Sequence, residues 1–324
     1  MSGNNFLVSV LIPSYNHEKY IQNTIKSIIN QTYQNIELII LDDGSKDNTF
    51  QKMNEMYEKC QKRFSNVIFK TKQNEGTTKT FNKLLDMALG EYIYIIASDD
   101  IAKENAIEKE IEFLSKNKDY GLCVGDNEII DFENKVCYWD KNRKLVYEKQ
   151  KAKYLTFGDY LKQSRKDVDF NSVNFGRYDT LAFGNYIPNG YLIKKEVFDK
   201  IGYFTFDAPL EDYWLMLQIS KYYKMKFLDE ILFQYRWHDT NSAKNTKRMD
   251  LFFNKTIEYE KQILKNIDKN VVLKPVIDFI NQGYLFETKG IKNIFQIEIY
   301  KKFNQKIKKI KIFNKNIFSY SKVH

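Results

Sequence analysis

The sequence predicts an α/β fold in which a mostly parallel, Rossmann-like sheet is flanked by helices. Short apolar runs alternate along the chain with segments whose apolar residues recur at helical spacing. Two of the runs, "NIELIILDD" at 35–43 and "YIYIIASDD" at 92–100, are rich in β-branched and aromatic residues and end on adjacent carboxylates. Runs of this composition are typical of strands buried on both faces. Their alternation with helices favours parallel strands joined by right-handed crossovers.

The N-terminal part of the chain alternates regularly between strand and helix patterns. Ile21, Ile25 and Ile28 mark one face of the first helix, and Asp47 stands at the N-cap position expected for the second. We expect, in order, a strand at 6–13, a helix at 20–30, a strand at 35–43, a helix from about 47, a strand at 66–71, a helix at 77–88 and a strand at 92–100.

The pattern continues less regularly beyond this point. A helix near 104–117 and a short strand at 120–126 are expected, whereas residues 127–187 show no clear period and are interpreted as an excursion that builds the second half of a site. Regular patterns return at 190–202 and in the helix "LEDYWLMLQISKYY" at 210–223. From about residue 245 onward the chain is expected to be helical.

Length and composition indicate a globular protein. The chain has 324 residues, of which 43% are hydrophobic, enough for one large domain or two ordinary ones. No apolar stretch reaches the roughly 18 residues of a spanning helix, and the N-terminus lacks a signal-peptide pattern, so we expect the chain in the cytoplasm. The three cysteines, Cys60, Cys123 and Cys137, have no CxxC spacing and are expected to be reduced and buried.

The net charge of +9 is concentrated in the C-terminal tail. Residues 301–324 contain eight lysines and no acid, which leaves 43 basic and 42 acidic residues elsewhere. Phe303, Ile307, Ile310 and Phe313 recur at helical spacing in this tail, which predicts an amphipathic helix on an anionic membrane surface. An AT-rich genome, which enriches Lys, Asn and Ile along the whole chain, explains the same charge, and packing against the catalytic domain or a second subunit explains the same apolar face. A nucleic-acid partner is not expected.

The paired carboxylates indicate a metal-bridged phosphate site. In open α/β sheets ligands bind outside the carboxyl ends of the strands, where the acids at 42–43 and 99–100 are expected. Neither a GxGxxG fingerprint nor a GxxxxGK[ST] phosphate loop occurs in the sequence. Because acids repel a bare phosphate, a cation must bridge the two, and carboxylates are ligands that Mg²⁺ and Mn²⁺ prefer. The sequence therefore predicts a site for a nucleotide diphosphate and a divalent metal.

Six motifs between Val8 and Ala243 carry a family resemblance. In chain order they are "VSVLIPSYNHEKYI", "LIILDDGSKDNT", "NEGTTKTFN", "GEYIYIIASDD", "EDYWLMLQ" and "YRWHDTNSA". Together they resemble the family 2 glycosyltransferases of the GT-A fold. The resemblance implies inverting hexosyl transfer from a nucleotide-sugar donor, most often a UDP-sugar, to a glycan or lipid-linked acceptor in bacterial polysaccharide biosynthesis.

The resemblance also implies a domain organisation. Residues 1–244 would form the GT-A domain, with a nucleotide-sugar-binding half at about 1–126 and an acceptor half at 127–244. Residues 245–324 would form a C-terminal helical region that ends in the basic tail. Membrane contact through that tail would place the enzyme at the inner face of the cytoplasmic membrane.

The family pattern assigns the donor nucleoside to the ends of the first strands. Pro13, Ser14 and Tyr15 would lie beside the nucleoside, with Tyr15 along the base, and Asp43 would accept the N3 hydrogen of uracil. Cytosine has an acceptor at N3 and would leave that carboxylate unpaired. Lys79 would take the place of an arginine that relatives commonly carry. From the residues alone, Asp43 also fits a simple turn cap.

The resemblance assigns the metal to the second acid pair. Asp100 would be the direct ligand of Mn²⁺ or Mg²⁺, and Asp99 would face the ribose or a metal-bound water. His238 would lie near the diphosphate or the metal. Arg236 would help to neutralise the leaving group, which is the main electrostatic demand of the reaction. From the residues alone, the acid pair also fits a solvated helix cap.

The acceptor residues follow in the second half of the chain. Asp212 matches the general base that deprotonates the acceptor hydroxyl, with Glu211 as its partner or as an acceptor contact. Asn189 and Gly190 fall where the family lines the acceptor pocket. An acid pair at the start of a helix also fits the helix macrodipole alone.

Two rival functions remain at this stage. A sugar nucleotidyltransferase has the same fold class, but it normally needs a glycine-rich, basic phosphate loop near the first strand. A non-catalytic nucleotide-sugar or carbohydrate binder would be expected to lose acids such as Asp99 and Asp212, and both are present.

Overall fold

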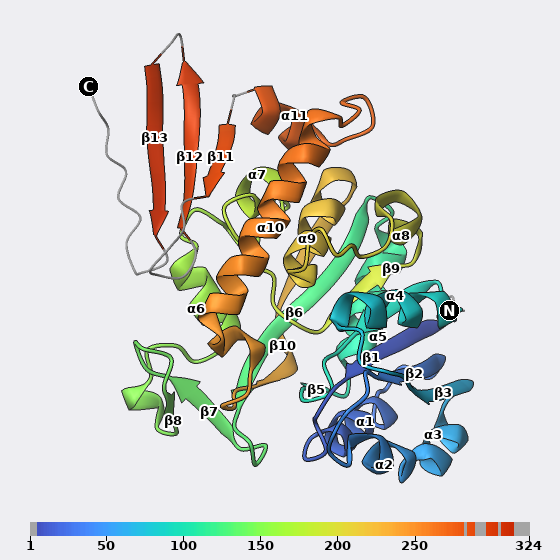
Figure 1. Ribbon diagram of the computed structural model, residues 1–324. Coiled ribbons are helices and arrows are strands. Elements are labelled where there is room, and N and C mark those ends of the chain that lie inside the picture. Colours follow the sequence, from blue (N-terminus) through green and yellow to red (C-terminus); the bar gives the residue numbers. More distant parts are fainter. Residues whose placement is uncertain (1–4, 282–283, 289–295, 304–305, 314–324) are drawn as a thin grey trace. The chain divides into compact units, whose positions relative to one another are not determined.

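The computed structural model describes residues 5–281, 284–288, 296–303 and 306–313 (Figure 1). The described chain forms two compact units. Unit 1 comprises Met1–Phe175, Ile187–Tyr203 and Tyr223–His238, and unit 2 comprises Gly176–Tyr186, Phe204–Tyr222 and Asp239–His324. Each unit is therefore assembled from segments that are distant in the sequence.

Unit 1 is built on one large sheet in the strand order β3-β2-β1-β4-β9-β6-β10-β5. The strands are β1 Val8–Ser14, β2 Ile36–Asp42, β3 Asn66–Thr71, β4 Tyr92–Ile95, β5 Ile101–Ala102, β6 Tyr120–Ile130, β9 Tyr191–Lys194 and β10 Lys224–Arg236. The first four strands in the order pair in parallel, as does β6 with β10, whereas β9 and β5 pair antiparallel to their neighbours. The predicted α/β class with a mostly parallel sheet is confirmed.

The helices of unit 1 follow the predicted alternation. They are α1 Ile21–Ile29, α2 Thr49–Asn54, α3 Tyr57–Arg63, α4 Thr77–Met87, α5 Ala106–Lys116, α6 Phe157–Ser164 and α8 Glu196–Ile201. The helix expected from about Asp47 is two short helices, α2 and α3. The main core joins the apolar residues of the parallel strands to the buried faces of α1 and α5.

The strand expected at 92–100 is shorter than predicted. Strand β4 ends at Ile95, and Asp99 and Asp100 lie in the turn that follows it. Both carboxylates are buried. Their place beyond the carboxyl end of a central parallel strand is the place at which ligands bind in open α/β sheets.

The irregular segment after β6 forms a small substructure of its own. Strands β7 Val136–Trp139 and β8 Leu145–Val146 and the short 3-10 helix η1 Lys149–Lys151 follow β6. A second cluster of buried aromatic residues, centred on Trp139 and including Trp237, packs beneath them. Trp237 of this cluster lies between the end of β10 and His238, so that the cluster fixes the segment that carries His238.

Unit 2 consists mainly of helices up to Asn281. These are α7 Tyr178–Leu181, α9 Glu211–Tyr222, η2 Ser242–Lys244, α10 Thr246–Lys265 and α11 Lys274–Asn281. Helices α10 and α11 agree with the predicted C-terminal helical extension. The ring of Tyr213 stacks on Phe253, with centroids 5.4 Å apart, so that α9 and α10 share a packed face.

The prediction of a helix in the basic tail is wrong. The described residues beyond α11 form an antiparallel sheet of β11 Tyr284–Thr288, β12 Gln296–Phe303 and β13 Lys306–Phe313 (Figure 1, red). The segment "QIEIY" alternates apolar and polar residues with the period of a strand, and β-branched isoleucines favour strands. Residues 314–324 of the predicted tail lie outside the described residues.

Two composition-based expectations can be compared with the structure. Cys60, Cys123 and Cys137 are buried and free of disulfides, as expected. Among the residues that the structure describes, none of the helices has the length and apolar character needed to cross a membrane.

Candidate functional site

The loops that follow β1 and β2 place the predicted nucleoside-binding residues on one edge of the sheet. Ser14 is buried at the end of β1, its carbonyl accepts a hydrogen bond of 2.8 Å from the amide of Asp43, and Tyr15 beyond it is 40% exposed. Pro13 lies in β1 next to Ser14. The strand ends thus bring Ser14 and Asp43 together, and they leave the Tyr15 ring accessible for contact with a ligand.

Asp43 is held by the turn that precedes α4. Its carboxylate accepts hydrogen bonds of 2.9 Å from the amides of Glu75 and Gly76, and it pairs with Lys72. The neighbouring Asp42 instead accepts bonds from Ser45 and Thr71 and closes its own turn. The two adjacent acids therefore differ: Asp42 ties its own turn to the end of β3, and Asp43 is oriented at the strand end by donors from the loop that precedes α4.

Lys79 projects from the first turns of α4 into solvent. Its ammonium group lies 2.9 Å from a carboxylate oxygen of Glu75, and its side chain is 48% exposed. Glu75 is shared with Lys83, whose ammonium lies 2.6 Å from it. Lys79 is therefore near the turn that holds Asp43, but its position is that of an exposed helix lysine.

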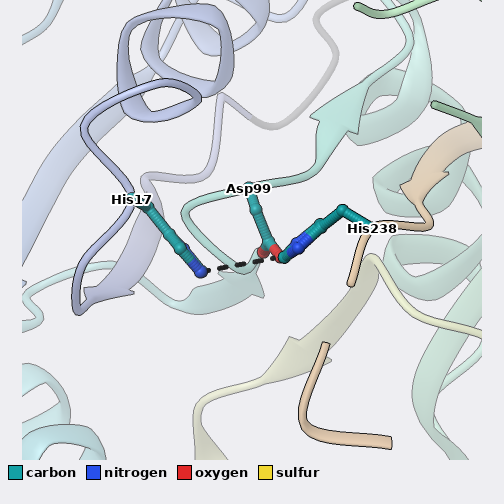
Figure 2. Close-up of side chains that lie close together, drawn as sticks. All are labelled: His17, Asp99 and His238. Carbon is teal, nitrogen blue, oxygen red and sulfur yellow. Dashed lines mark hydrogen bonds and ion pairs between the residues drawn. The ribbon is translucent and has the colours of Figure 1, made fainter. Parts of the chain in front are cut away.

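Asp99 lies between two histidines from distant parts of the chain (Figure 2). Its Oδ2 is 2.9 Å from Nε2 of His238 and 3.8 Å from Nε2 of His17. The three ligand atoms of this cluster all lie within 4.8 Å of one another. Two imidazoles and one carboxylate of this kind can hold a divalent metal ion.

Both histidines are held in place by the structure around them. His17 lies at the entrance to α1, where its carbonyl accepts hydrogen bonds from the amides of Tyr20 and Ile21, and its Nδ1 is 2.7 Å from the hydroxyl of Ser98. His238 is the second residue after β10, and the centroid of its ring lies 5.0 Å from that of Tyr20. The cluster thus joins three loops at one edge of the sheet.

The electrostatics favour metal-binding protonation states. Burial alone would raise the pKa of Asp99, but the hydrogen bond with His238 and the nearby charge of His17 hold that pKa below its usual value. Burial lowers the pKa of His17, against the opposing effect of Asp99. An ionised carboxylate and a neutral imidazole are the forms that bind a metal ion.

Asp100 is bonded to β10 and is not part of this cluster. One of its carboxylate oxygens accepts a 2.8 Å hydrogen bond from the main-chain amide of Arg236, and burial together with the charge of Asp99 raises its pKa well above the usual value. The family resemblance predicts Asp100 as the direct metal ligand ahead of Asp99. The geometry brings Asp99, and not Asp100, to the two histidines.

Arg236 braces the turn that carries the two acids. Its side chain is fully buried and donates to the carbonyls of Asp99 and Asp131, at 2.6 and 2.7 Å, and to Oδ1 of Asn134, at 2.6 Å. Its guanidinium also lies over the ring of Tyr20, 4.7 Å from the centroid. These contacts hold the turn in place, and the expected contact of Arg236 with the leaving group stays a prediction.

Asn189 and Gly190 lie on the loop before β9. The side chain of Asn127 exchanges two 2.9 Å hydrogen bonds with the backbone of Asn189, so that this loop is fixed to β6. Gly190 has φ +71°, and a Cβ atom there would lie 2.0 Å from the ring of Phe233. Only glycine fits this close approach. Packing against Phe233 therefore explains why position 190 is a glycine, whether or not an acceptor binds there.

The predicted base and its neighbour belong to unit 2. Glu211 and Asp212 form the first turn of α9, and the side chain of Asp212 is exposed. Its carboxylate accepts a 2.7 Å bond from the amide of Tyr213 and lies 3.4 Å from the amide nitrogen of Asn185. An exposed carboxylate at a helix N-terminus is accessible to an incoming hydroxyl group.

A buried ion pair fixes the other end of α9. Lys221 lies 2.9 Å from Glu260 of α10, and both side chains are fully buried. Glu260 also accepts hydrogen bonds from Gln218, at 2.8 Å, and from the hydroxyl of Tyr178, at 2.5 Å. The network ties α7, α9 and α10 together and so sets the orientation of the helix that carries Asp212.

His17 and Ser98 were missed by the sequence analysis. The signal was present: His17 follows the first strand within "PSYNHEKY" and is one of only three histidines in the chain. What the sequence could not show is the turn at Ser98 that orients the imidazole toward Asp99.

Comparisons with known proteins agree with the family and the fold that the sequence motifs predict. The chain is 33% identical over 182 residues to an uncharacterized glycosyltransferase of Haemophilus influenzae, covering 56% of this chain and 69% of that protein. The mannosyltransferase PcManGT of Pyrobaculum calidifontis, solved with GDP-Man and Mn²⁺, aligns with TM-score 0.56 at 14% identity over 85% of this chain and 68% of that one.

A second solved structure, residues 1–349 of TarS from S. aureus in complex with UDP-GlcNAc, aligns with TM-score 0.51 at 15% identity, covering 95% of this chain and 99% of that one. At such identities the likeness shows the GT-A fold alone. The model of the family described as "Glycosyl transferase family 2" matches residues 9–178, which is more than half of the 324 residues. This chain therefore belongs to glycosyl transferase family 2.

Proposed function

We propose that the protein transfers a hexosyl group, with inversion, from a UDP-sugar to a hydroxyl of a glycan or lipid-linked acceptor. The observation that carries the proposal is the cluster of Asp99, His17 and His238 beyond the carboxyl end of β4, on the sheet edge that also carries Asp43. A metal-binding cluster beside a base-reading carboxylate is the arrangement that a nucleotide diphosphate requires.

The uridine preference is argued from Asp43. Three donors orient its carboxylate, and each carboxylate oxygen can accept more than one hydrogen bond, so that capacity remains for the N3–H of uracil. Cytosine offers an acceptor at N3 and would leave the carboxylate unpaired at that position. Solved proteins of the same fold hold either UDP-GlcNAc or GDP-Man, so the fold alone does not decide the base.

The metal role is argued from the chemistry of the cluster. Asp99, His17 and His238 would hold a divalent cation, and such a cation neutralises the charge that develops on the leaving diphosphate. The solved structure of PcManGT contains Mn²⁺, which is consistent with this assignment. The cluster also explains how buried acids at 99–100 could lie beside a diphosphate without strong repulsion.

The proposed reaction is a single displacement. The acceptor oxygen forms a bond to the anomeric carbon, the bond from that carbon to the diphosphate oxygen breaks, and its electron pair leaves with UDP. Asp212 takes the proton of the acceptor hydroxyl, and its exposed carboxylate is accessible for this purpose. Glu211, in the same helical turn, would orient the acceptor.

The test is a screen of nucleotide sugars for binding and turnover. We expect UDP to bind in the presence of Mn²⁺ and much more weakly in chelator, and a UDP-sugar to be slowly hydrolysed or transferred with release of UDP. Release of pyrophosphate from UTP and a sugar phosphate would instead identify a nucleotidyltransferase. Metal-dependent binding of UDP-sugars that never release UDP, with any acceptor, would identify a binding protein.

The proposed contact with the membrane depends on the positive charge of residues 301–324 alone. The amphipathic helix that motivated it is replaced by β12 and β13, but the eight lysines of residues 301–324 remain. Such a segment would hold the enzyme at the inner face of the cytoplasmic membrane beside a lipid-linked acceptor. Salt-sensitive co-sedimentation with anionic vesicles, lost on deletion of residues 301–324, would support this proposal.

A further inference from the structure

We infer that His17 is a direct metal ligand and that the resulting site, with two imidazoles and one carboxylate, selects Mn²⁺ over Mg²⁺. The inference rests on the proposed metal-assisted donor site and names the ion that this site takes. Its physical basis is the position of His17 relative to Asp99, Ser98 and His238, within unit 1 alone.

The distance between His17 and Asp99 suits a shared ion. Nε2 of His17 lies 3.8 Å from Oδ2 of Asp99, which is beyond a hydrogen bond. Two metal–ligand bonds of about 2.1 Å span up to about 4.2 Å, so one ion can contact both atoms. The third ligand atom, on His238, lies within 4.8 Å of the others, and a small side-chain adjustment brings all three to one ion.

Ser98 prepares the imidazole of His17 for coordination. Nδ1 of His17 lies 2.7 Å from the Ser98 hydroxyl, and Ser98 is itself buried. When Nδ1 donates its proton to that oxygen, Nε2 is left with a lone pair directed toward Asp99. Ligating histidines are usually oriented in this way by a partner on the other ring nitrogen.

The backbone of His17 adds rigidity to this arrangement. Its amide donates to the hydroxyl of Thr49 at 2.7 Å, and its carbonyl accepts from the first turn of α1. On the opposite side, the ring of His238 is packed against Tyr20. Both imidazoles are thus held at the ion position without the nucleotide.

The ligand atoms decide between Mg²⁺ and Mn²⁺, which the sequence alone does not distinguish. Mg²⁺ strongly prefers oxygen ligands and gives up its waters reluctantly, whereas Mn²⁺ accepts imidazole nitrogen more readily. Three protein ligands leave coordination positions for diphosphate oxygens. A site with two nitrogens and one carboxylate oxygen therefore binds Mn²⁺, and also Co²⁺, more tightly than Mg²⁺.

Pulsed EPR of the full-length protein with Mn²⁺ and UDP tests the ligand set directly. We expect ¹⁴N couplings from two imidazoles and ³¹P couplings from UDP at the same ion. His17→Gln and His238→Gln should each remove one imidazole coupling. His324→Gln is the matched control: it removes the third histidine of the chain, which lies outside the described residues, and should leave both couplings intact.

Calorimetry of Mn²⁺ and Mg²⁺ binding tests the selectivity. His17→Gln should reduce the ratio of Mn²⁺ to Mg²⁺ affinity by on the order of tenfold or more, and Ser98→Ala should weaken Mn²⁺ binding in the same direction. His17→Asp, which supplies oxygen in place of nitrogen, should bring the ratio closest to one.

The outcomes separate this inference from the proposed function. A wild-type spectrum with ³¹P couplings but only one imidazole, or a His17→Gln variant with unchanged couplings and selectivity, would overturn the role of His17 and leave the donor site standing. A wild-type protein that shows neither ³¹P nor ¹⁴N couplings would remove the proposed metal-assisted donor site itself. The wild-type spectrum is decisive even if a variant fails to fold.

Discussion

Asp99 Oδ2 lies 2.9 Å from Nε2 of His238, although the two residues are 139 positions apart in the sequence. The contact joins the turn after β4 to the end of β10, and the buried Arg236 braces the same two segments. A site of this kind is specified by the sheet order: β4 and β10 are separated in the sheet by β9 and β6, and the turn after β4 reaches β10 because it leads into β5, which pairs with β10.

We expect Asp99→Asn to abolish the metal dependence of UDP binding, because an amide replaces the only carboxylate of the His17–Asp99–His238 cluster. Asp100→Asn is the matched control: its amide oxygen can still accept from the amide of Arg236, and metal dependence should persist. Calorimetry with UDP in Mn²⁺ and in chelator measures both. The reverse result, with metal dependence lost only in Asp100→Asn, would return the ligand role to Asp100.

Asp43→Asn should reduce the preference for UDP over CDP by on the order of tenfold, because an amide can pair with either pyrimidine edge. The donors from Lys72, Glu75 and Gly76 that orient the native carboxylate explain why the substitution acts on selectivity. Asp42→Asn is the control, since the Asp42 carboxylate is bonded to Ser45 in its own turn and to Thr71 at the end of β3. Equal UDP and CDP affinities in the wild-type protein would contradict the role of Asp43.

Much of the sheet could be predicted from local pattern. The continuous apolar run of β2 predicts a buried strand, and the spacing of the isoleucines in α1 predicts a helix. The helix prediction for the tail is wrong because Phe303, Ile307, Ile310 and Phe313 satisfy a helical spacing, while "KIKI" at 309–312 also alternates with the period of a strand. Pairing with a neighbouring strand decided the outcome, and pairing is not a local property.

The candidate site was only partly predictable for the same reason. The positions of Asp43 and Asp99 at strand ends follow from chain order. The direction in which each carboxylate points does not: Asp100 turns to the amide of Arg236, and Asp99 turns to His238. Those partners come from 136 and 139 residues away, so that no local signal could rank the two acids.

Glu110→Gln should stabilise the protein at neutral pH and much less at acidic pH. Glu110 is fully buried in α5, and burial raises its pKa well above the usual value. Above about pH 4.3 the unfolded state ionises this carboxyl while the folded state does not, so stability falls as pH rises, by up to about 1.4 kcal/mol per pH unit. Urea unfolding at pH 4 and pH 7 measures the difference. A variant equally stabilised at both pH values would contradict this explanation.

Lys221→Met should lower the free energy of unfolding by about 3–5 kcal/mol, because it leaves the buried carboxylate of Glu260 without its cation. The double variant Lys221→Met with Glu260→Gln should recover part of the loss, since the neutral amide can keep bonds to Gln218 and Tyr178. Urea denaturation measures both variants. If the single and double variants were equally unstable, the loss would come from packing and not from the unpaired charge.

Asp212→Asn should keep Mn²⁺-dependent UDP affinity while sugar transfer falls by roughly 100-fold or more, the effect of losing a positioned general base. The exposed carboxylate is replaced by a group of the same size, so that α9, anchored by Lys221 and Glu260, should keep its place. Glu211→Gln in the same turn is the control and should raise KM for the acceptor more than it lowers kcat. Initial rates of UDP release at saturating donor, together with calorimetry of UDP, give both quantities. Wild-type turnover in Asp212→Asn would exclude this residue as the base. A loss of UDP affinity that parallels the loss of transfer would show that the substitution shifted the helix, and the lower rate could then not be assigned to loss of the base.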